Sequence, residues 1–105
     1  MAKYNNRKVE IDGIRFDSKA EGNHYLYLKS RLQSGEIMDL VCHPKYIMDV
    51  NGVRICTYRP DFQYQESGRL VVEDVKSKPT MTYSYKLKKK LMKAIHGIDV
   101  IDVVN

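Results

Sequence analysis

Two aspartates stand at corresponding positions on either side of a predicted hairpin turn at Ser67-Gly68. If these two residues form the loop, the register that follows places Asp61 directly opposite Asp74; a three-residue loop would pair Asp61 with Glu73 instead. Directly opposed residues have Cβ atoms about 4.5–5.5 Å apart, and like charges at that distance destabilise a sheet. A divalent cation would remove the repulsion, and ligands that are all oxygen favour Mg²⁺ or Mn²⁺.

Lys76 lies two residues beyond Asp74 and therefore points to the same face of the predicted sheet. Glu73 points to the opposite face, so we expect no metal ligand there. Alone, Asp74 and Lys76 are also typical of an exposed strand with an ion pair, and Asp61 after Pro60 is typical of a turn. The surrounding residues favour a site inside the sheet, because they are apolar: Phe62, Leu70, Val71, Val72 and Val75.

Glu21 is a third acidic candidate, and it lies at a predicted helix start. Ser18 followed three residues later by Glu21 is a capping-box pattern, and Gly35 is a natural end for the helix. The cap and a metal site compete for the same carboxylate. If Glu21 turns toward the sheet, the cap is weaker.

Turn signals divide the rest of the chain into short elements. Asp12-Gly13 and Asn51-Gly52 are typical of two-residue hairpin loops, whereas His43-Pro44 interrupts a β-like stretch, because proline cannot donate to a ladder. A lysine-rich helix is predicted to open at Pro79-Thr80 and to end at Gly97. The expected order is a hairpin (8–16), the first helix, strands at 37–50, 53–65 and 70–76, the lysine-rich helix, and a β-branched closing strand at 98–104.

Length and composition fit one α/β domain over residues 1–105, built on a mixed sheet whose last strand follows a crossover helix. The chain is 43% hydrophobic and 30% charged, which argues against wholesale disorder. It contains no apolar run near the ~20 residues of a membrane span and begins without the hydrophobic stretch of a signal peptide. The two cysteines cannot make a disulfide framework, so a cytoplasmic setting is expected. The three histidines share no metal-ligand spacing, which favours surface or packing roles for His24, His43 and His96.

The positive charge is concentrated in one segment. The net charge is +5, and seven lysines but no acid lie between Val75 and Ile98. Such a block indicates a polyanionic partner, and it favours DNA or RNA over an anionic membrane. The alternative is a basic face that only contacts solvent. The candidate nucleic-acid contacts are Lys78, Tyr85, Lys86, Lys89, Lys90 and Lys93. For Tyr85, packing in the protein interior is an equal alternative.

Together these residues resemble the PD-(D/E)XK nuclease motif. Pro60-Asp61 matches its first pair, Asp74-Val75-Lys76 matches its second part, and Glu21 matches the acid on the first helix of that superfamily. Ser77 departs from the glycine expected after the motif lysine, a position with no assigned side-chain role. More narrowly, nearly the whole chain resembles small phage and prophage proteins of the DUF1064 type, in residues 9–19, 35–37, 58–62, 72–76 and 85–88.

The resemblance implies a restriction-endonuclease-like core of α-β-β-β-α-β order, preceded by an N-terminal β-hairpin. It implies that Asp61, Asp74 and the Val75 backbone carbonyl bind Mg²⁺, for which Mn²⁺ can substitute. Glu21 would reach the ion directly or through a water. Lys76 would orient or deprotonate the attacking water. The four catalytic candidates are therefore Glu21, Asp61, Asp74 and Lys76.

The expected function is that of a phage-encoded DNA endonuclease that acts in the host cytoplasm. We expect it to be structure-selective, like a Holliday-junction resolvase, because no segment looks like a separate sequence-reading domain. A homodimer is expected because resolving a four-way junction requires two matched cuts, and the hairpin at 9–16 is the candidate pairing surface. The alternatives are a non-catalytic nucleic-acid-binding protein on the same fold and a nuclease subunit that needs a partner protein.

Overall fold

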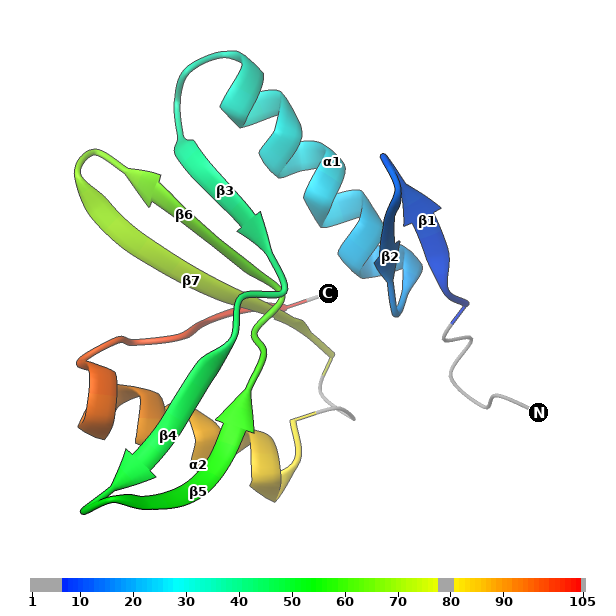
Figure 1. The fold of residues 1–105 in the computed structure, drawn as a ribbon. Coiled ribbons are helices and arrows are strands. Elements are labelled where there is room, and N and C mark those ends of the chain that lie inside the picture. Colours follow the sequence, from blue (N-terminus) through cyan, green and yellow to red (C-terminus); the bar gives the residue numbers. More distant parts are fainter. Residues whose placement is uncertain (1–6, 78–80, 105) are drawn as a thin grey trace.

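The computed structural model describes residues 7–77 and 81–104, and its centre is a mixed four-stranded sheet in the order β3-β6-β7-β8. β7 is antiparallel to β6 and parallel to β8, as expected for a last strand that follows a crossover helix. Two smaller antiparallel pairs, β1-β2 and β4-β5, complete the α/β fold (Figure 1). The strands are β1 (Val9–Ile11), β2 (Ile14–Phe16), β3 (Met38–Cys42), β4 (Tyr46–Val50), β5 (Val53–Tyr58), β6 (Phe62–Glu66), β7 (Arg69–Lys76) and β8 (Ile101–Val104).

The tight turns form where the sequence predicts them. Both loop residues have positive φ at Ser67-Gly68 (52° and 76°), the conformation of the hairpin turns that match strand twist. Asp12-Gly13 and Asn51-Gly52 have the same combination. The β6-β7 ladder pairs Glu66 with Arg69 and ends at Phe62 and Glu73, so the two-residue loop and its register are confirmed.

Helix α1 (Lys19–Gln33) begins at its predicted cap and supports the first hairpin. Ser18 Oγ accepts the Glu21 N–H at 3.1 Å. The β1-β2 hairpin packs on this helix through a close approach: a Cβ on Gly22 would lie 2.7 Å from Val9 Cγ2. Phe16 at the end of the hairpin is fully buried. A short isolated hairpin is marginally stable unless it packs on another element, and here α1 of the same chain provides the packing surface.

The prediction of a single strand at 53–65 is wrong, because this stretch forms two strands, β5 and β6, that belong to different sheets. The stretch at 37–50 breaks at the same level, between β3 and β4, as His43-Pro44 indicated. Pro44 and Pro60 are buried at the two breaks, and neither can donate a ladder hydrogen bond. The His43 N–H instead donates to the Asp61 carbonyl at 2.9 Å, which joins the breaks to each other.

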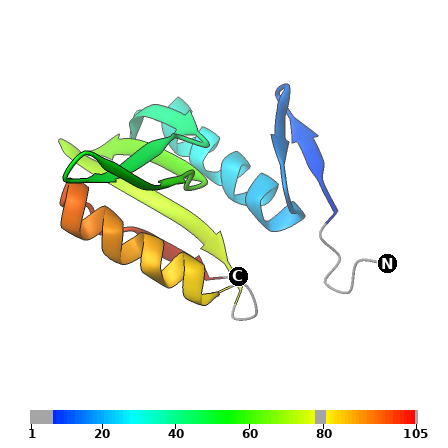
Figure 2. The same cartoon turned by 60° about the horizontal axis from the view of Figure 1, so that its bottom comes forward.

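The two faces of the central sheet carry the two helices, as Figure 2 shows. One core, centred on Phe62, lies under α1: Phe16, Tyr25, Leu28, Ile37, Phe62 and Tyr64. The other, centred on Val72, lies under the second helix and the β4-β5 pair: Met48, Tyr58, Val72, Tyr85, Met92 and Val100. Alternate residues of β7 therefore face opposite helices.

The lysine-rich helix α2 (Tyr83–Leu91) is capped by Thr82, whose Oγ1 accepts the Tyr85 N–H at 3.1 Å. The predicted opening at Pro79-Thr80 lies outside the described residues. α2 continues into a π-helical turn, η2 (Met92–His96), and Gly97 ends it at φ 69°, as predicted. Within the described ranges, neither helix is long and apolar enough to cross a membrane.

Candidate functional site

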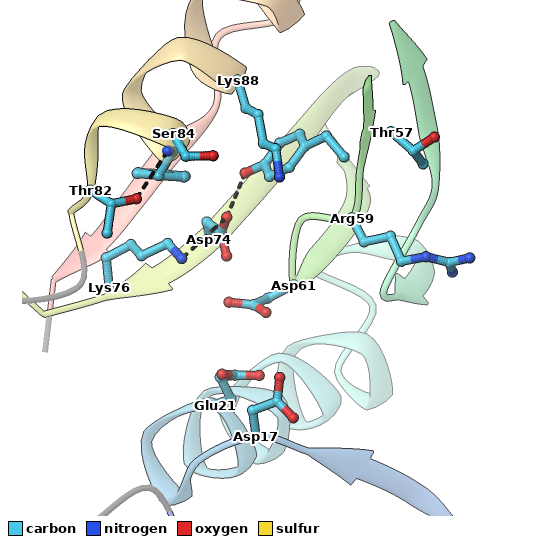
Figure 3. A pocket seen from close by; sticks show the side chains of 12 residues that line it. Asp17, Glu21, Thr57, Arg59, Asp61, Asp74, Lys76, Thr82, Ser84 and Lys88 are labelled. Atoms are coloured by element: carbon cyan, nitrogen blue, oxygen red, sulfur yellow. Dashed lines mark hydrogen bonds and ion pairs between the residues drawn. The ribbon is translucent and has the colours of Figure 1, made fainter. Parts of the chain in front are cut away.

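A pocket of about 500 Å³ opens where the start of α1, the break before β6, the end of β7 and the start of α2 meet (Figure 3). Asp17 and Glu21 lie on its α1 side, whereas Asp74 lies on the opposite side, beside Lys76 and the start of α2 (Figure 3). Its lining comprises Asp17, Glu21, Thr57, Tyr58, Arg59, Asp61, Asp74, Lys76, Thr82, Ser84, Tyr85 and Lys88. All four predicted catalytic residues are thus brought together in one pocket.

Asp74 is the most enclosed of the acids in this pocket, with 3% of the residue exposed. It lies on the α2 face of β7, and the Tyr58 hydroxyl donates a hydrogen bond to its Oδ2. Burial, followed by the neighbouring Asp61 carboxylate, raises the pKa of Asp74 to about 8. In the metal-free protein this carboxyl group therefore favours its protonated, neutral form at neutral pH.

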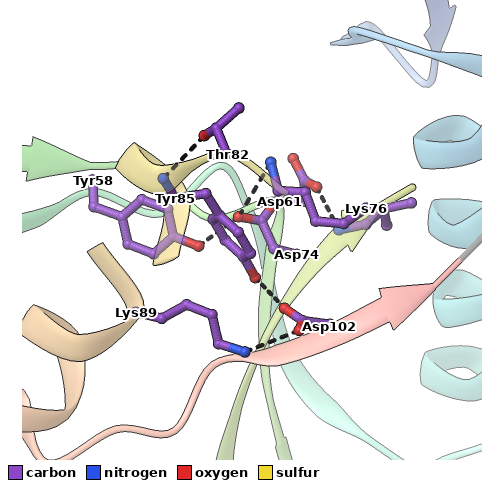
Figure 4. Close-up of polar contacts among 9 residues, drawn as sticks. Tyr58, Asp61, Asp74, Lys76, Thr82, Tyr85, Lys89 and Asp102 are labelled. Atoms are coloured by element: carbon purple, nitrogen blue, oxygen red, sulfur yellow. Dashed lines mark hydrogen bonds and ion pairs between the residues drawn. The ribbon is translucent and has the colours of Figure 1, made fainter. Parts of the chain in front are cut away.

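Asp61 lies in the bend before β6, one residue short of the ladder, and not within a strand as predicted. Its Oδ2 accepts the Val75 N–H at 2.8 Å, so the side chain is fixed to the strand that carries Asp74 (Figure 4). Burial also raises the pKa of Asp61. The predicted proximity of the two aspartates is thus reached by a side-chain hydrogen bond rather than by strand pairing.

Glu21 comes to the pocket from the first turn of α1. Its backbone takes part in the cap, while its carboxylate turns toward Asp61 (Figure 3). The Oε1 atom is buried and has no hydrogen-bond partner among the described residues. Burial, and then the Asp17 carboxylate, raise the pKa of Glu21. A buried oxygen that is left unpaired is costly, so this atom has the surroundings of a ligand that awaits a cation.

Lys76 is the cation that the structure places beside these acids. Its Nζ lies 3.9 Å from Asp74 Oδ2 and 4.5 Å from the centre of the Tyr85 ring. One ammonium faces three carboxylates whose pKa values are all raised by burial. A set of carboxylate oxygen donors fits a hard divalent cation such as Mg²⁺ or Mn²⁺, and a bound cation would favour the charged form of each carboxyl group.

His43 was expected to have a surface or packing role, and the structure brings it to the site. Its ring contacts Phe16, with centroids 5.6 Å apart. Ligand-capable atoms of Glu21, His43 and Asp61 all lie within 4.8 Å of one another. The signal in the sequence was the pair of breaks at His43-Pro44 and Pro60-Asp61. These breaks meet only when the segment between them, which forms β4 and β5, folds back on itself.

The predicted nucleic-acid contacts divide into two groups. Tyr85 is buried and donates to Asp102 on β8, which favours its packing role (Figure 4). Lys89 Nζ lies 3.0 Å from Asp102 Oδ2, and Lys93 forms an ion pair with Asp99. Lys86 and Lys90 are exposed on α2, whereas Lys78 lies outside the described residues. Two basic residues that the sequence analysis did not select, Lys88 and Arg59, line the pocket itself.

Glu73 lies on the α1 face of β7, away from the pocket, as predicted. His24 Nε2 of α1 lies 2.8 Å from its Oε1, and the Tyr64 hydroxyl donates to its Oε2 at 2.8 Å. Both carboxylate oxygens are therefore engaged, Oε1 with α1 and Oε2 with the neighbouring strand β6.

Comparison with known proteins supports one assignment. No curated protein matches the chain. The model of one family, DUF1064, which is described as a protein of unknown function, matches residues 1–100. Because the match spans nearly the whole chain, this protein belongs to the DUF1064 family.

Proposed function

We propose that this protein is a Mg²⁺-dependent endodeoxyribonuclease that hydrolyses phosphodiester bonds, with Mn²⁺ as an alternative ion. One observation supports this function above all. The carboxylates of Glu21, Asp61 and Asp74, of which Asp74 is buried and the other two are half-buried, converge with Lys76 in one pocket. Further basic side chains, those of Arg59 and Lys88, line the same pocket. A site that hydrolyses phosphodiester bonds needs acidic side chains that bind a metal ion and basic side chains that bind the phosphate.

Asp61, Asp74, the Val75 backbone carbonyl and Glu21 would hold the ion. The unpaired Glu21 Oε1 and the raised pKa values of the three carboxyl groups fit this role, because a cation removes both penalties. When bound, Mg²⁺ would polarise the scissile phosphate and increase the acidity of a water near neutral pH.

Lys76 and the basic residues would act on the substrate directly. Lys76 lies beside Asp74, where it would orient the attacking water or take its proton and offset charge that develops on the phosphate. Arg59 and Lys88 line the same pocket and would bind neighbouring phosphates. Lys86 and Lys90 are exposed on another side of α2, where they would contact phosphates outside the pocket. Such contacts position the DNA backbone and read no sequence.

Within this class we propose a phage-encoded, structure-selective enzyme of the Holliday-junction-resolvase type, which works as a homodimer in the host cytoplasm. Two matched cuts in a four-way junction require two sites at a fixed spacing, which a two-fold dimer supplies. The β1-β2 hairpin already packs on α1, so its need for a packing partner no longer favours it as the dimer surface. Light scattering at micromolar concentration should give twice the 12.2 kDa chain mass. A monomer that cuts four-way DNA with unpaired nicks would refute both the dimer and the resolvase assignment.

The test of the function is cleavage of linear, flapped, single-stranded and four-way DNA with Mg²⁺, Mn²⁺ or EDTA. We expect cleavage with either ion, none in EDTA, and a preference for branched DNA. Asp74→Asn should abolish cleavage while DNA binding stays equal or becomes tighter. Asp99→Asn is the matched control, because this exposed acid lies outside the pocket and should leave cleavage unchanged. Binding without cleavage by the wild type under all conditions would favour the non-catalytic alternative, unless an added partner protein restores cleavage.

A further inference from the structure

We propose that His43 supplies a nitrogen ligand to the divalent cation held by Glu21 and Asp61, so that the affinity for Mn²⁺ depends on this imidazole. The inference rests on the proposed function for the presence of a metal site. It adds a ligand that the sequence did not indicate and a preference among metals that an all-oxygen site would lack.

The first support is the distance between the donor atoms. One ligand-capable atom each from Glu21, His43 and Asp61 lies within 4.8 Å of the other two. An ion with bonds of about 2.1 Å spans at most about 4.2 Å between opposite ligands. Only one pair among three ligands can be opposite, and neighbouring ligands at right angles lie about 3.0 Å apart. Two of the atoms therefore have to approach by up to roughly 1.8 Å, which side-chain rotation can supply.

The second support is the way in which the backbone fixes His43. Its φ of 55° is in the left-handed region, where few residues other than glycine lie and where Asn, Asp and His are enriched. Its N–H donates to the Asp61 carbonyl, and Pro44 follows in a buried position. His43 and Asp61 are thus joined through their backbones, and the Phe16 ring supports the imidazole. The pair is held in place before any ion arrives.

The third support is the buried Glu21 Oε1 atom, which has no hydrogen-bond partner among the described residues. Glu21 is also a member of the cluster that contains His43. A buried acceptor without a donor is rare in folded proteins and points to an ion or a water at that place. An ion there would be bound by both carboxylates and by the imidazole.

Because the proposed ligands include both oxygen and nitrogen atoms, the choice of ion decides whether binding by His43 can be detected. Carboxylates suit Mg²⁺, Ca²⁺ and Mn²⁺, whereas imidazole suits first-row transition metals. Mn²⁺ belongs to both groups, and its unpaired electrons make a directly bound nitrogen visible to electron spin echo spectroscopy. Mg²⁺ gains far less from the imidazole. Loss of His43 should therefore weaken Mn²⁺ binding much more than Mg²⁺ binding.

The experiment measures Mn²⁺ binding without DNA and without turnover. Wild-type protein with one equivalent of Mn²⁺ should show spin-echo modulation from ¹⁴N, which changes to the ¹⁵N pattern when histidine is ¹⁵N-labelled. His43→Asn should lose it, because asparagine tolerates the positive φ but offers no imidazole. In this variant the Mn²⁺ dissociation constant should rise roughly tenfold or more, while the Mg²⁺ constant, measured by competition, should change less than threefold. His96→Gln is the matched control; His96 contacts the Ile47 carbonyl far from the pocket lining, and the modulation should persist.

The outcomes separate this inference from the proposed function. If Mn²⁺ binds the wild type without nitrogen modulation, His43 is not a ligand, while the carboxylate site stands. If the modulation persists in a folded His43→Asn protein, another nitrogen is responsible and the assignment is refuted. The labelled wild type gives an answer even where the variant does not fold. If millimolar Mn²⁺ does not bind at all, both the inference and the proposed metal site are wrong.

Discussion

Replacing Asp74 with asparagine should stabilise the metal-free protein at pH 8, although the residue lies in the interior. Burial raises the pKa of Asp74 from 3.8 to about 8. Between these values the native state binds more protons than the unfolded state, so the free energy of unfolding falls as the pH rises. The stability associated with protonated Asp74 is complete below about pH 4 and is lost as the pH passes through 8. Asparagine keeps an oxygen acceptor for the Tyr58 hydroxyl and removes the charge.

The size of the effect follows from the same shift. Each pKa unit corresponds to about 1.4 kcal/mol, so a shift of roughly four units sets an upper limit of about 6 kcal/mol. Asp61 and Lys76 lie beside Asp74 and share in its titration, which lowers the value to be expected. We therefore expect Asp74→Asn to be more stable than the wild type at pH 8 in EDTA by on the order of 2 kcal/mol. At pH 4 the difference should be close to zero.

Urea unfolding from pH 4 to pH 8 in EDTA measures this directly. The exposed Asp99 provides the control, since Asp99→Asn changes the net charge equally and should stay within about 0.5 kcal/mol of the wild type. Added Mn²⁺ should reverse the order at pH 8, because binding stabilises the protein that keeps its ligands. An Asp74→Asn protein that is less stable than the wild type at pH 8 in EDTA would show that the carboxylate has a structural role and would refute the reasoning.

Three further variants test other parts of the protein. Lys76→Met should lower the rate of DNA cleavage by about 10²-fold or more while Mn²⁺ affinity is kept or increased, and an unchanged rate would remove this lysine from the mechanism. Tyr85→Phe should destabilise the protein by about 1 kcal/mol through the lost hydrogen bond to β8 without changing the salt dependence of DNA binding; a shallower salt dependence would restore the tyrosine as a DNA contact. Neutralising Lys86 and Lys90 together, the exposed lysines one turn apart on α2, should weaken binding to every DNA by a similar factor. The salt slope should fall by up to about 0.9 per lost phosphate contact, whereas an unchanged slope would indicate a solvated surface.

Short-range signals in the sequence predicted much of this arrangement. The Ser67-Gly68 turn fixes the register of β6 and β7 through two residues that accept positive φ, so Asp61 lies one residue beyond the end of the ladder, near Asp74. The side-chain hydrogen bond from Val75 to Asp61, which completes the approach, was not predicted. The cap at Ser18 predicted where α1 begins, and thereby the position of Glu21 on its first turn. Each of these features depends on residues a few positions apart, where local conformation outweighs tertiary context.

The features that could not be predicted depend on contacts between distant segments. The break before β6 is joined to the break after β3 by the hydrogen bond between His43 and Asp61, which no local pattern encodes. The lysines of α2 looked alike in sequence, but β8 supplies Asp102, which pairs with Lys89 and anchors the buried Tyr85. Which lysines stay free to bind a phosphate was therefore decided by a strand that follows the helix.

The arrangement of β7 explains how so small a protein can hold repelling carboxylates in place. Adjacent residues of this strand face opposite helices, so Asp74 enters the pocket while Glu73 turns toward α1. His24 binds Glu73 from α1, and it lies three residues, nearly one turn, after Glu21. The bond between His24 and Glu73 therefore sets the distance between the helix that carries Glu21 and the strand that carries Asp74. The favourable contact between His24 and Glu73 on one face of the sheet offsets the unfavourable proximity of the carboxyl groups in the pocket. The carboxyl groups are thereby held close together, as the binding of a cation requires.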